Sequence, residues 1–319
     1  MKAHTLLPLL LAAVTPTVAL AAEYPSRPIR IVVPFTAGSA SDLLARMIGP
    51  KLTEAWGQQV VVDNRPSAGG TVAGQIVAGS APDGHTLMIT SSAFAGAAAL
   101  YDKLPYDPVK DFSGITQVAA TYLVLVAGTG GPRSVKDLIA MAREKPGRIN
   151  YGSSGIGSGT HYGGELFKLA AKIDLVHVPY RGVPEALTDT MSGRIQVAMS
   201  PTLIAAPLIR SGRLVALGVT ASQRLGVLPD VPTIAEAALP GFVYEGWFGA
   251  LCPSRTPRAT VAKLNREIGR VMTLPENQER IAREGSVARV STPEEFEKLV
   301  RGEIVMRTKV FKAAGAKPE

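Results

Sequence analysis

Two short stretches rich in serine, threonine and glycine are the parts of this sequence best suited to bind an anion. The first consists of Phe35, Thr36, Ala37, Gly38, Ser39, Ala40, Ser41 and Asp42, and the second consists of Ser153, Ser154, Gly155, Ile156, Gly157, Ser158, Gly159, Thr160 and His161. Small residues let backbone N–H groups approach a ligand, and the hydroxyls add further donors. Each stretch lies between an expected strand and an expected helix, whose first N–H groups lack internal partners and carry partial positive charge. The sequence therefore predicts two nearly uncharged cradles for a carboxylate or a phosphate.

Each stretch also has a simpler interpretation, because Ser and Thr are common caps of ordinary helices. One such loop alone would favour that interpretation, whereas two loops at equivalent places in two α/β units favour ligand binding. Asp42 is expected to complement the dipole of the helix that it begins. It would repel an anion if it faced the site.

Other polar residues follow expected strands and could shape the same site. Arg181 is either a bidentate clamp for a carboxylate or a solvated loop cation, and both interpretations stay open. Tyr180 could line the pocket with its ring and its hydroxyl. The residues that could set specificity at the distal end of the pocket are Ser91, Ser92, Tyr180 and Ser200.

The chain lacks the common sequence signatures of enzymes. No serine lies in a G-x-S-x-G motif, and neither a phosphate-binding P-loop nor an H-E-x-x-H motif occurs. Cys252 is the only cysteine, which excludes a disulfide framework and a C-x-x-C pair. We therefore predict a binding protein with no catalytic residue, no metal and no cofactor. The alternative is an exported enzyme that acts on a carboxylate or phosphate ester, with Ser158 and His161 as a catalytic pair.

The histidines that follow the first 21 residues have ordinary structural interpretations. His161 and Glu165 lie four residues apart on one expected helix and could share a metal, but no third ligand is nearby. His161 is therefore expected beside the second stretch, in the first turn of a helix. His177 is expected in a buried strand as a hydrogen-bonded core residue, and His85 is expected to be exposed after a Pro-Asp-Gly turn.

Residues 1–21 have the pattern of an export signal. Lys2 supplies a positive start, a proline-interrupted apolar stretch follows, and Ala19-Leu20-Ala21 fits the small-x-small cleavage rule. The apolar stretch is too short to span a bilayer. We expect cleavage near Ala21 and a periplasmic location.

The rest of the chain alternates strand-like and helix-like segments, which predicts an α/β fold. The strand–helix–strand–helix–strand order of residues 29–89, with its short connections, predicts a parallel sheet with helices on both faces. The expected strands are residues 29–33, 60–62, 86–89, 115–127, 149–152, 175–178, 195–199, 214–219 and 247–251. The expected helices are residues 43–56, 71–80, 135–141, 160–171 and 184–191, a short helix near 204, and a long one after Thr292.

Two long apolar segments, at residues 115–127 and 242–252, indicate that two strands cross between two lobes, with the second α/β unit inserted into the first. The predicted organisation is a signal peptide over residues 1–21, one lobe over residues 22–120 and 245–319, and another lobe over residues 121–244. Loops at the carboxyl ends of parallel strands form the ligand site in such folds.

The composition is that of a globular protein of about two domains. Of 319 residues, 46% are hydrophobic and only 19% are charged, which excludes intrinsic disorder. The formal net charge is +8, but the cations are scattered without a basic run or interleaved aromatic residues. This pattern argues against nucleic-acid binding and leaves a mild long-range field that favours anions.

Short motifs spread over almost the whole chain carry a family resemblance. They are Ile31-Val32-Val33-Pro34-Phe35, Asp42-Leu43-Leu44-Ala45-Arg46, Val61-Val62-Asp63-Asn64-Arg65-Pro66, Gly69-Gly70, Ala81-Pro82-Asp83-Gly84, Leu104-Pro105-Tyr106-Asp107-Pro108, Val178-Pro179-Tyr180-Arg181-Gly182, Val231-Pro232-Thr233-Ile234-Ala235-Glu236, Trp247-Phe248-Gly249 and Ser291-Thr292-Pro293-Glu294-Glu295-Phe296. This ordered set resembles the substrate-binding proteins of tripartite tricarboxylate transporters, the Bug-type periplasmic solute-binding family.

The resemblance implies a two-lobe periplasmic binding protein of type II (a Venus flytrap) that closes around a small mono- or dicarboxylate and delivers it to membrane permease subunits. It also implies that residues 35–42 and 153–161 hold one ligand carboxylate. The sequence departs from the family at Ser39, where many members have Gly, and at Gln196 and Ser200, where many have acidic residues. These departures favour an anionic or neutral ligand over an amino acid. We expect a monomer that binds a small organic carboxylate.

Overall fold

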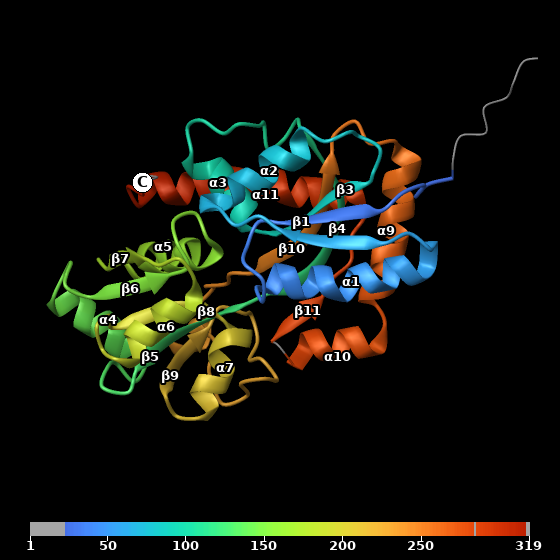
Figure 1. Cartoon of the computed structure of the whole chain (residues 1–319). Helices are drawn as coiled ribbons and strands as arrows, with labels where there is room; N and C mark the ends of the chain where they lie inside the picture. The colour runs from blue at the N-terminus through green and yellow to red at the C-terminus, as the bar shows by residue number, and fades with distance from the viewer. Residues whose placement is uncertain (1–22, 284, 317–319) are drawn as a thin grey trace, which may run out of the picture.

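The computed structural model describes residues 23–283 and 285–316, which form two β-sheets with helices on both faces of each (Figure 1). The predicted export signal lies outside the described residues. Within these ranges, no helix is both long and apolar enough to cross a membrane.

The first sheet has six strands, and only part of it is parallel. Its order is β11 (Ser286–Ala288), β4 (Phe112–Thr121), β10 (Gly246–Pro253), β3 (Thr86–Ser91), β1 (Ile29–Val33) and β2 (Val60–Asn64). β1 is parallel to β2 and β3, whereas β10 is antiparallel to β3 and β4, and β11 is antiparallel to β4. The parallel pairing expected for the first three strands is confirmed, whereas β4, β10 and β11 add antiparallel pairs, because they are not joined to their neighbours by the strand–helix–strand crossover that parallel pairing requires.

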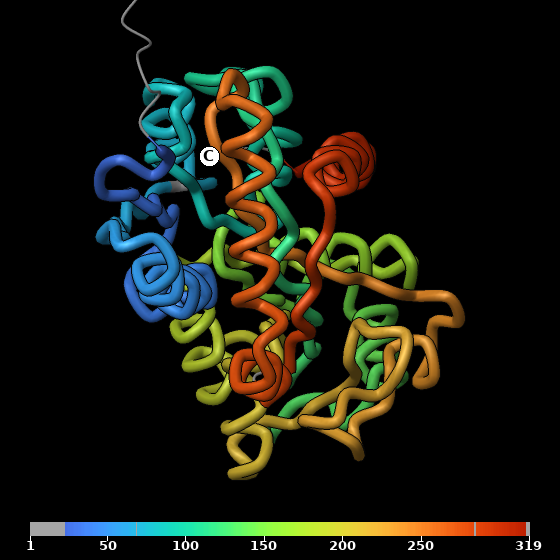
Figure 2. The backbone as a smooth tube through the Cα atoms, turned by 90° about the vertical axis from the view of Figure 1, so that its right-hand side faces the viewer, coloured from blue at the N-terminus to red at the C-terminus, as the bar shows by residue number. Residues whose placement is uncertain are grey.

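Successive residues of β1 face opposite sides of the first sheet, and each side has its own core. Ile31 packs with α1 (Ala40–Trp56) and α9 (Arg258–Met272), whereas Val32 packs with α2 (Thr71–Ala78), α3 (Ala93–Leu100) and α11 (Pro293–Ala313). The other helices beside the first sheet are η1 (Ala68–Gly70), which is a single 3-10 turn, and α10 (Pro275–Arg283). In Figure 2, α9 is seen from the side and α11 nearly end-on, so the two helices run in different directions.

The second sheet has five strands and is also mixed. Its order is β7 (Val176–Pro179), β6 (Asn150–Ser153), β8 (Val197–Pro201), β5 (Leu123–Gly128) and β9 (Leu214–Val219). β6 is parallel to β7 and β8, and β5 is antiparallel to β8 and β9. α4 (Val135–Glu144), α5 (Gly159–Ala171) and α8 (Ile234–Ala237) share one core with this sheet, and α6 (Val183–Met191) and α7 (Thr202–Arg210) share the other.

The chain passes between the sheets twice, as expected from its two long apolar segments. The first segment divides at Tyr122 into β4, which belongs to the first sheet, and β5, which belongs to the second. The return passage lies beside the first, because the N–H of Thr220 donates to the carbonyl of Leu123 at 2.8 Å and the N–H of Tyr244 donates to the carbonyl of Thr220 at 2.9 Å. The strand expected over residues 247–251 is longer than predicted, because β10 runs from Gly246 to Pro253, and it leaves the start of the apolar segment 242–252 outside the sheet.

Among the elements around the first sheet that were not expected from the sequence, α3 and β11 are the least recognisable. α3 has the sequence AFAGAAAL, and most of its residues are buried, so it shows no alternation of polar and apolar faces. β11 has only three residues and lies at the sheet edge. Both elements are recognisable only from their tertiary packing.

Candidate ligand-binding site

The first loop, residues 35–42, connects β1 to α1 and fixes the helix start with two reciprocal hydrogen bonds. Ser39 is the N-cap residue, and its Oγ accepts a hydrogen bond from the N–H of Asp42 at 3.3 Å. The N–H of Gly38, whose φ is +81°, donates to Oδ2 of Asp42 at 2.9 Å. Thr36, Ala37 and Gly38 are exposed, so the tip of the loop is open to solvent.

The second loop, residues 153–161, connects β6 to α5 and repeats this arrangement. Ser158 is the N-cap residue, and its Oγ accepts a hydrogen bond from the N–H of His161 at 3.1 Å. The N–H of Gly157, whose φ is +77°, donates to Nδ1 of His161 at 3.1 Å. Each helix therefore begins with a left-handed glycine, a capping serine and a third helical residue whose side chain binds that glycine.

Hydroxyl groups converge within the second loop. Oγ1 of Thr160 lies 2.9 Å from Oγ of Ser154 and 2.9 Å from Oγ of Ser158, and it accepts the N–H of Ser154 at 2.8 Å. Oγ of Ser153 accepts the N–H of Gly155 at 3.1 Å. These hydroxyls can each donate or accept, so the cluster can adapt its donors to a bound anion.

Asp42 supports the first loop through several donors. Its exposed fraction is 2%, and besides Gly38 it accepts hydrogen bonds from Nε of Arg46 at 3.0 Å and from Nδ2 of Asn64 at 2.9 Å. Burial alone would raise the pKa of Asp42, but hydrogen bonds from Arg46, Gly38 and Asn64 hold it below its usual value. Asp42 is therefore ionised and directed at its own loop and its neighbours.

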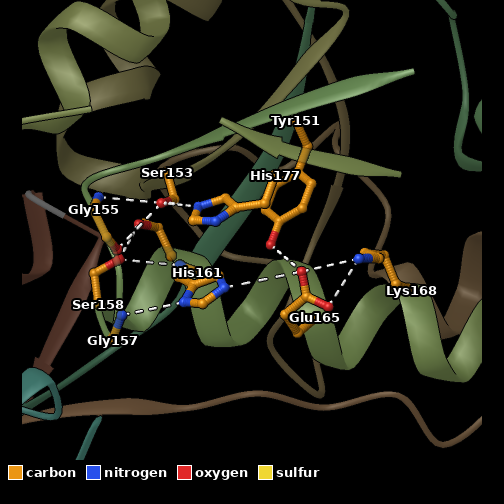
Figure 3. A network of polar contacts seen from close by, with 10 residues as sticks. Tyr151, Ser153, Gly155, Gly157, Ser158, His161, Glu165, Lys168 and His177 are labelled. Carbon is orange, nitrogen blue, oxygen red and sulfur yellow. Dashed lines mark hydrogen bonds and ion pairs between the residues drawn. The ribbon is translucent and has the colours of Figure 1, made fainter. Parts of the chain in front are cut away.

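His161 lies in a column of stacked rings beneath the second loop (Figure 3). Its imidazole stacks on that of His177 with 4.0 Å between ring centroids, and Tyr151 stacks on His177 at 4.9 Å. Phe311 of α11 stacks on His161 at 4.9 Å. Burial, followed by the neighbouring His177, lowers the pKa of His161 to about 3. Burial also lowers the pKa of His177 to about 4. Both rings are therefore neutral near pH 7.

A buried carboxylate ends the network shown in Figure 3. Glu165 accepts a hydrogen bond from the Tyr151 hydroxyl and pairs with Nζ of Lys168 at 2.9 Å. Nε2 of His161 lies 4.0 Å from Oε1 of the same carboxylate. Among the described residues, no group of three or more His, Cys, Asp or Glu side chains is placed to hold a metal ion.

The geometry does not supply the catalytic pair of the enzyme alternative. Oγ of Ser158 accepts the backbone N–H of His161, not a hydrogen bond from its ring. Nδ1 of that ring accepts from Gly157 and Nε2 points towards Glu165, so neither nitrogen is directed at Ser158.

The expectations for the other two histidines were partly wrong. His85 is buried, with an exposed fraction of 6%, because the ring of Tyr24 packs on it and the N–H of Ser26 donates to its Nε2. His177 lies 2.6 Å from Oγ of Ser153, as a hydrogen-bonded residue should, but β7 is an edge strand and His177 is only half-buried.

The remaining predicted site residues also follow strands, but several side chains already have partners. Tyr180 and Arg181 follow β7, where the Tyr180 hydroxyl donates to Asp189 at 2.9 Å and Arg181 is exposed. Ser200 is near the end of β8, is buried and donates to the carbonyl of Pro201 at 3.0 Å. Ser91 ends β3, and its Oγ accepts the N–H of Ala93 at 3.3 Å. These residues lie at the same sheet edges as the two loops.

The second loop directly contacts α3, a helix that packs on the first sheet. A side chain at Gly96 of α3 would overlap the carbonyl oxygen of Gly157, so the helix and the loop touch backbone to backbone. A side chain at Gly159 would lie 2.9 Å from the Tyr244 hydroxyl and 3.3 Å from Oγ of Ser92. Ser92 and the start of α5 are therefore adjacent.

Sequence reasoning missed Tyr244 and Arg307 as residues near this site. The Tyr244 hydroxyl lies 3.3 Å from Oγ of Ser92, and Nη2 of Arg307 donates to the same hydroxyl at 3.0 Å. The only signal at Arg307 is a Glu303–Arg307 pair spaced four residues apart, which is typical of an exposed helix face. Burial by α5 could not be foreseen from that spacing.

The comparisons with known proteins place this geometry in a class. Residues 44–315 match the model of the tripartite tricarboxylate transporter family receptor. A Pseudomonas sp. (strain P51) protein from the tcbD-tcbE intergenic region, called a UPF0065 protein, is 39% identical over 282 residues, which cover 88% of this chain and 84% of the relative.

Two solved structures have the same fold over nearly their whole length. Rpa4515 of R. palustris with adipate is 33% identical, with a TM-score of 0.86 and coverage of 93% of this chain and 100% of that one. MatC of Rhodopseudomonas palustris with bound malate is 32% identical, with a TM-score of 0.81 and coverage of 90% and 99%. The two-lobe fold is that of the solute-binding proteins. The chain belongs to the tripartite tricarboxylate transporter receptor family, which includes the Bug proteins.

Proposed function

We propose that this protein binds a small organic carboxylate between its two loops and delivers it to the membrane subunits of a tripartite transporter. One observation carries the proposal, namely that each sheet contributes a helix start of the same design, with Gly38, Ser39 and Asp42 in one and Gly157, Ser158 and His161 in the other. Adipate and malate in the two similar structures support a carboxylate as the ligand.

The donors of the site are backbone and hydroxyl groups. The first N–H groups of a helix have no acceptor within it and carry partial positive charge. Those of α1 and α5 would be joined by the hydroxyls of Ser154, Ser158 and Thr160. Hydrogen bonds to a charged group contribute about 1.5–3 kcal/mol each, so three or four of them, less the cost of ordering, can reach the roughly −8 kcal/mol of micromolar affinity.

The proposed lobes are residues 22–120 with 245–319, and residues 121–244, which would close on the ligand by bending at the two passages between the sheets. The protein is proposed to be a periplasmic monomer after removal of the export signal near Ala21. It is also proposed to return its ligand chemically unchanged, without catalysis. Ser91, Ser92, Tyr180 and Ser200 would set the specificity at the distal end of the pocket.

A thermal-shift screen of aliphatic, aromatic, di- and tricarboxylates tests this function, with the matching diamides as uncharged controls. A specific ligand at a hundredfold excess over its dissociation constant should add about 2.7 kcal/mol of stability. The proposal fails if no carboxylate raises the midpoint or if diamides act equally. Chromatography of the recovered ligand tests for catalysis, since any turnover would favour the enzyme alternative.

A further inference from the structure

Arg307 is buried in α11 at a cost that packing alone does not explain. Its exposed fraction is 0%; its Nε donates to Oε2 of Glu303 at 2.6 Å, and Nη2 donates to the Tyr244 hydroxyl at 3.0 Å. The guanidinium also lies over the ring of Tyr162, 4.1 Å from its centroid, and Nη1 has no hydrogen-bond partner among the described residues. A buried ion pair is a poor source of stability, because desolvation of two charges offsets most of their attraction. This arrangement suggests a role other than stability.

A chain of hydroxyls connects Arg307 to the start of α5. The Tyr244 hydroxyl, which Arg307 binds, lies 3.3 Å from Oγ of Ser92. Both hydroxyls lie directly against Gly159, where an added side chain would meet them at 2.9 and 3.3 Å. Gly159 is the first residue of α5, so the guanidinium is one hydroxyl group away from the proposed anion site.

The same chain is anchored to the passages between the sheets. The N–H of Tyr244 donates to the carbonyl of Thr220 at 2.9 Å, and Oγ1 of Thr220 donates to the carbonyl of Tyr244 at 2.8 Å. Thr220 also accepts the N–H of Leu123 at its Oγ1, at 2.9 Å. Tyr244 lies in the segment that returns to the first sheet, and Thr220 ties it to Leu123 in the segment that leaves that sheet.

α11 contacts the second loop at a further point. Phe311, one turn after Arg307, stacks on His161 with 4.9 Å between ring centroids. Arg307 itself covers Tyr162, the next residue along the chain. The last helix of the described chain thus packs on the two residues that follow Thr160.

We propose that Arg307 is a positioning residue of the carboxylate site. It holds the Tyr244 and Ser92 hydroxyls against Gly159, and so fixes the second loop relative to the end of β3. This inference rests on the proposed function, and Arg307 acts without touching the ligand.

Hydrogen exchange and calorimetry on Arg307→Met and Tyr244→Phe test the proposal. We expect adipate, or whichever carboxylate of the screen binds the wild-type protein, to bind roughly tenfold more weakly to Arg307→Met and roughly threefold more weakly to Tyr244→Phe. Amides of residues 153–161 should exchange roughly tenfold faster in both variants, while amides of residues 35–42 keep their rates. A purely structural role would change both loops together, through global unfolding.

Arg301→Met on the exposed side of the same helix is the matched control and should match the wild type in both measurements. Tyr244→Phe keeps the ring and therefore remains informative if Arg307→Met does not fold. The proposal is overturned if the second loop of a folded variant exchanges at the wild-type rate, or if affinity stays within a factor of two of the wild type. If no carboxylate binds the wild type, the proposed function fails, while the exchange comparison still decides the positioning role.

Discussion

The two loops have the same backbone design but differ in charge and in accessibility. In the first, the acceptor for the glycine N–H is the ionised carboxylate of Asp42, and the tip of the loop is exposed. In the second, the acceptor is a neutral imidazole, that of His161, which is held in a ring stack with Phe311 of α11, while α3 lies against the backbone of Gly157. A negative charge on the third helical residue offsets the partial positive charge at the start of its helix, whereas a neutral ring leaves that partial charge available to an anion. The second loop is therefore expected to provide most of the affinity for an anion, whereas the first loop is the one more accessible to solvent.

Acid should disrupt the second loop before the first. The folded-state pKa values of His161 and His177, about 3 and about 4, lie below the ordinary 6.5. The stability from the neutral rings is complete above about pH 6.5 and declines as pH falls towards 4. Between pH 7 and pH 5 we expect a loss of about 4 kcal/mol from the two groups together.

Urea denaturation at both pH values measures this loss, with a His161→Asn, His177→Gln double variant as the control. The double variant should lose roughly 4 kcal/mol less than the wild type on going to pH 5. An equal pH dependence in both proteins would show that the ring stack does not carry the effect. Asp42, whose pKa is lowered, should remain ionised across this range.

Exchanging the acceptor of the second loop should remove its anion preference. In His161→Asp the carboxylate can still accept the Gly157 N–H, but it adds a negative charge a few ångströms from the proposed ligand. Coulomb repulsion at about 6 Å and an effective dielectric constant of about 20 costs about 3 kcal/mol, or about a hundredfold in affinity.

His161→Asn, which offers an uncharged acceptor, is the matched control for this exchange. Calorimetry should show carboxylate binding to His161→Asn within about tenfold of the wild type, with His161→Asp far weaker. Equal affinities of the two variants would place the anion away from α5.

Crowding α3 should displace the second loop alone. Gly96→Ala would place a methyl group on the carbonyl oxygen of Gly157, and such overpacking typically costs about 1–3 kcal/mol. Gly302→Ala in α11 is the control, because nothing lies within 4 Å of the added methyl and helix propensity should stabilise it by up to about 1 kcal/mol. Thermal denaturation should show a lower melting temperature for Gly96→Ala and a higher one for Gly302→Ala, relative to the wild type. A higher melting temperature for Gly96→Ala would contradict the contact between α3 and the second loop.

Removal of the caps should have the smallest effect and should sharpen the comparison. Ser39→Ala and Ser158→Ala each lose an N-cap hydrogen bond, worth about 1 kcal/mol of stability. Ser158→Ala also loses its contact with Thr160, so only this variant should weaken carboxylate binding by more than about threefold. Paired calorimetry and urea denaturation separate the two effects, and equal affinities would argue against the assignment to the second loop.

The strands and the capped helices were accessible from the sequence because their signals are local. The β-branched run Ile29–Val33 forms a strand as expected, and the capping boxes at Thr233 and Thr292 depend on residues only about three positions apart in the sequence. The antiparallel strands β4 and β10 were not recognised as such, because strand direction depends on partners far away in the chain. α3 was missed because a helix buried on nearly all sides has no amphipathic pattern.

The candidate site was predicted where it depends on strand ends, and not where it depends on packing between the sheets. Both Ser/Gly loops could be found because small residues follow strands in both units. The burial of Arg307 and the stack of His161 on Phe311 could not, because they join segments about 150 positions apart. The Tyr180 hydroxyl donates to Asp189, so a hydroxyl at the expected end of a strand can already be occupied by a hydrogen bond within the protein.

The position of α11 at the end of the chain also bears on the order of folding. Phe311 and His161 are about 150 positions apart in the chain, so their contact requires the intervening chain to lose conformational entropy. In a molecule in which this helix has not docked, the second loop would lack the stack and the buried guanidinium even where the strands of the second sheet are already paired. Ligand affinity would then report the completion of folding more sensitively than the content of secondary structure does.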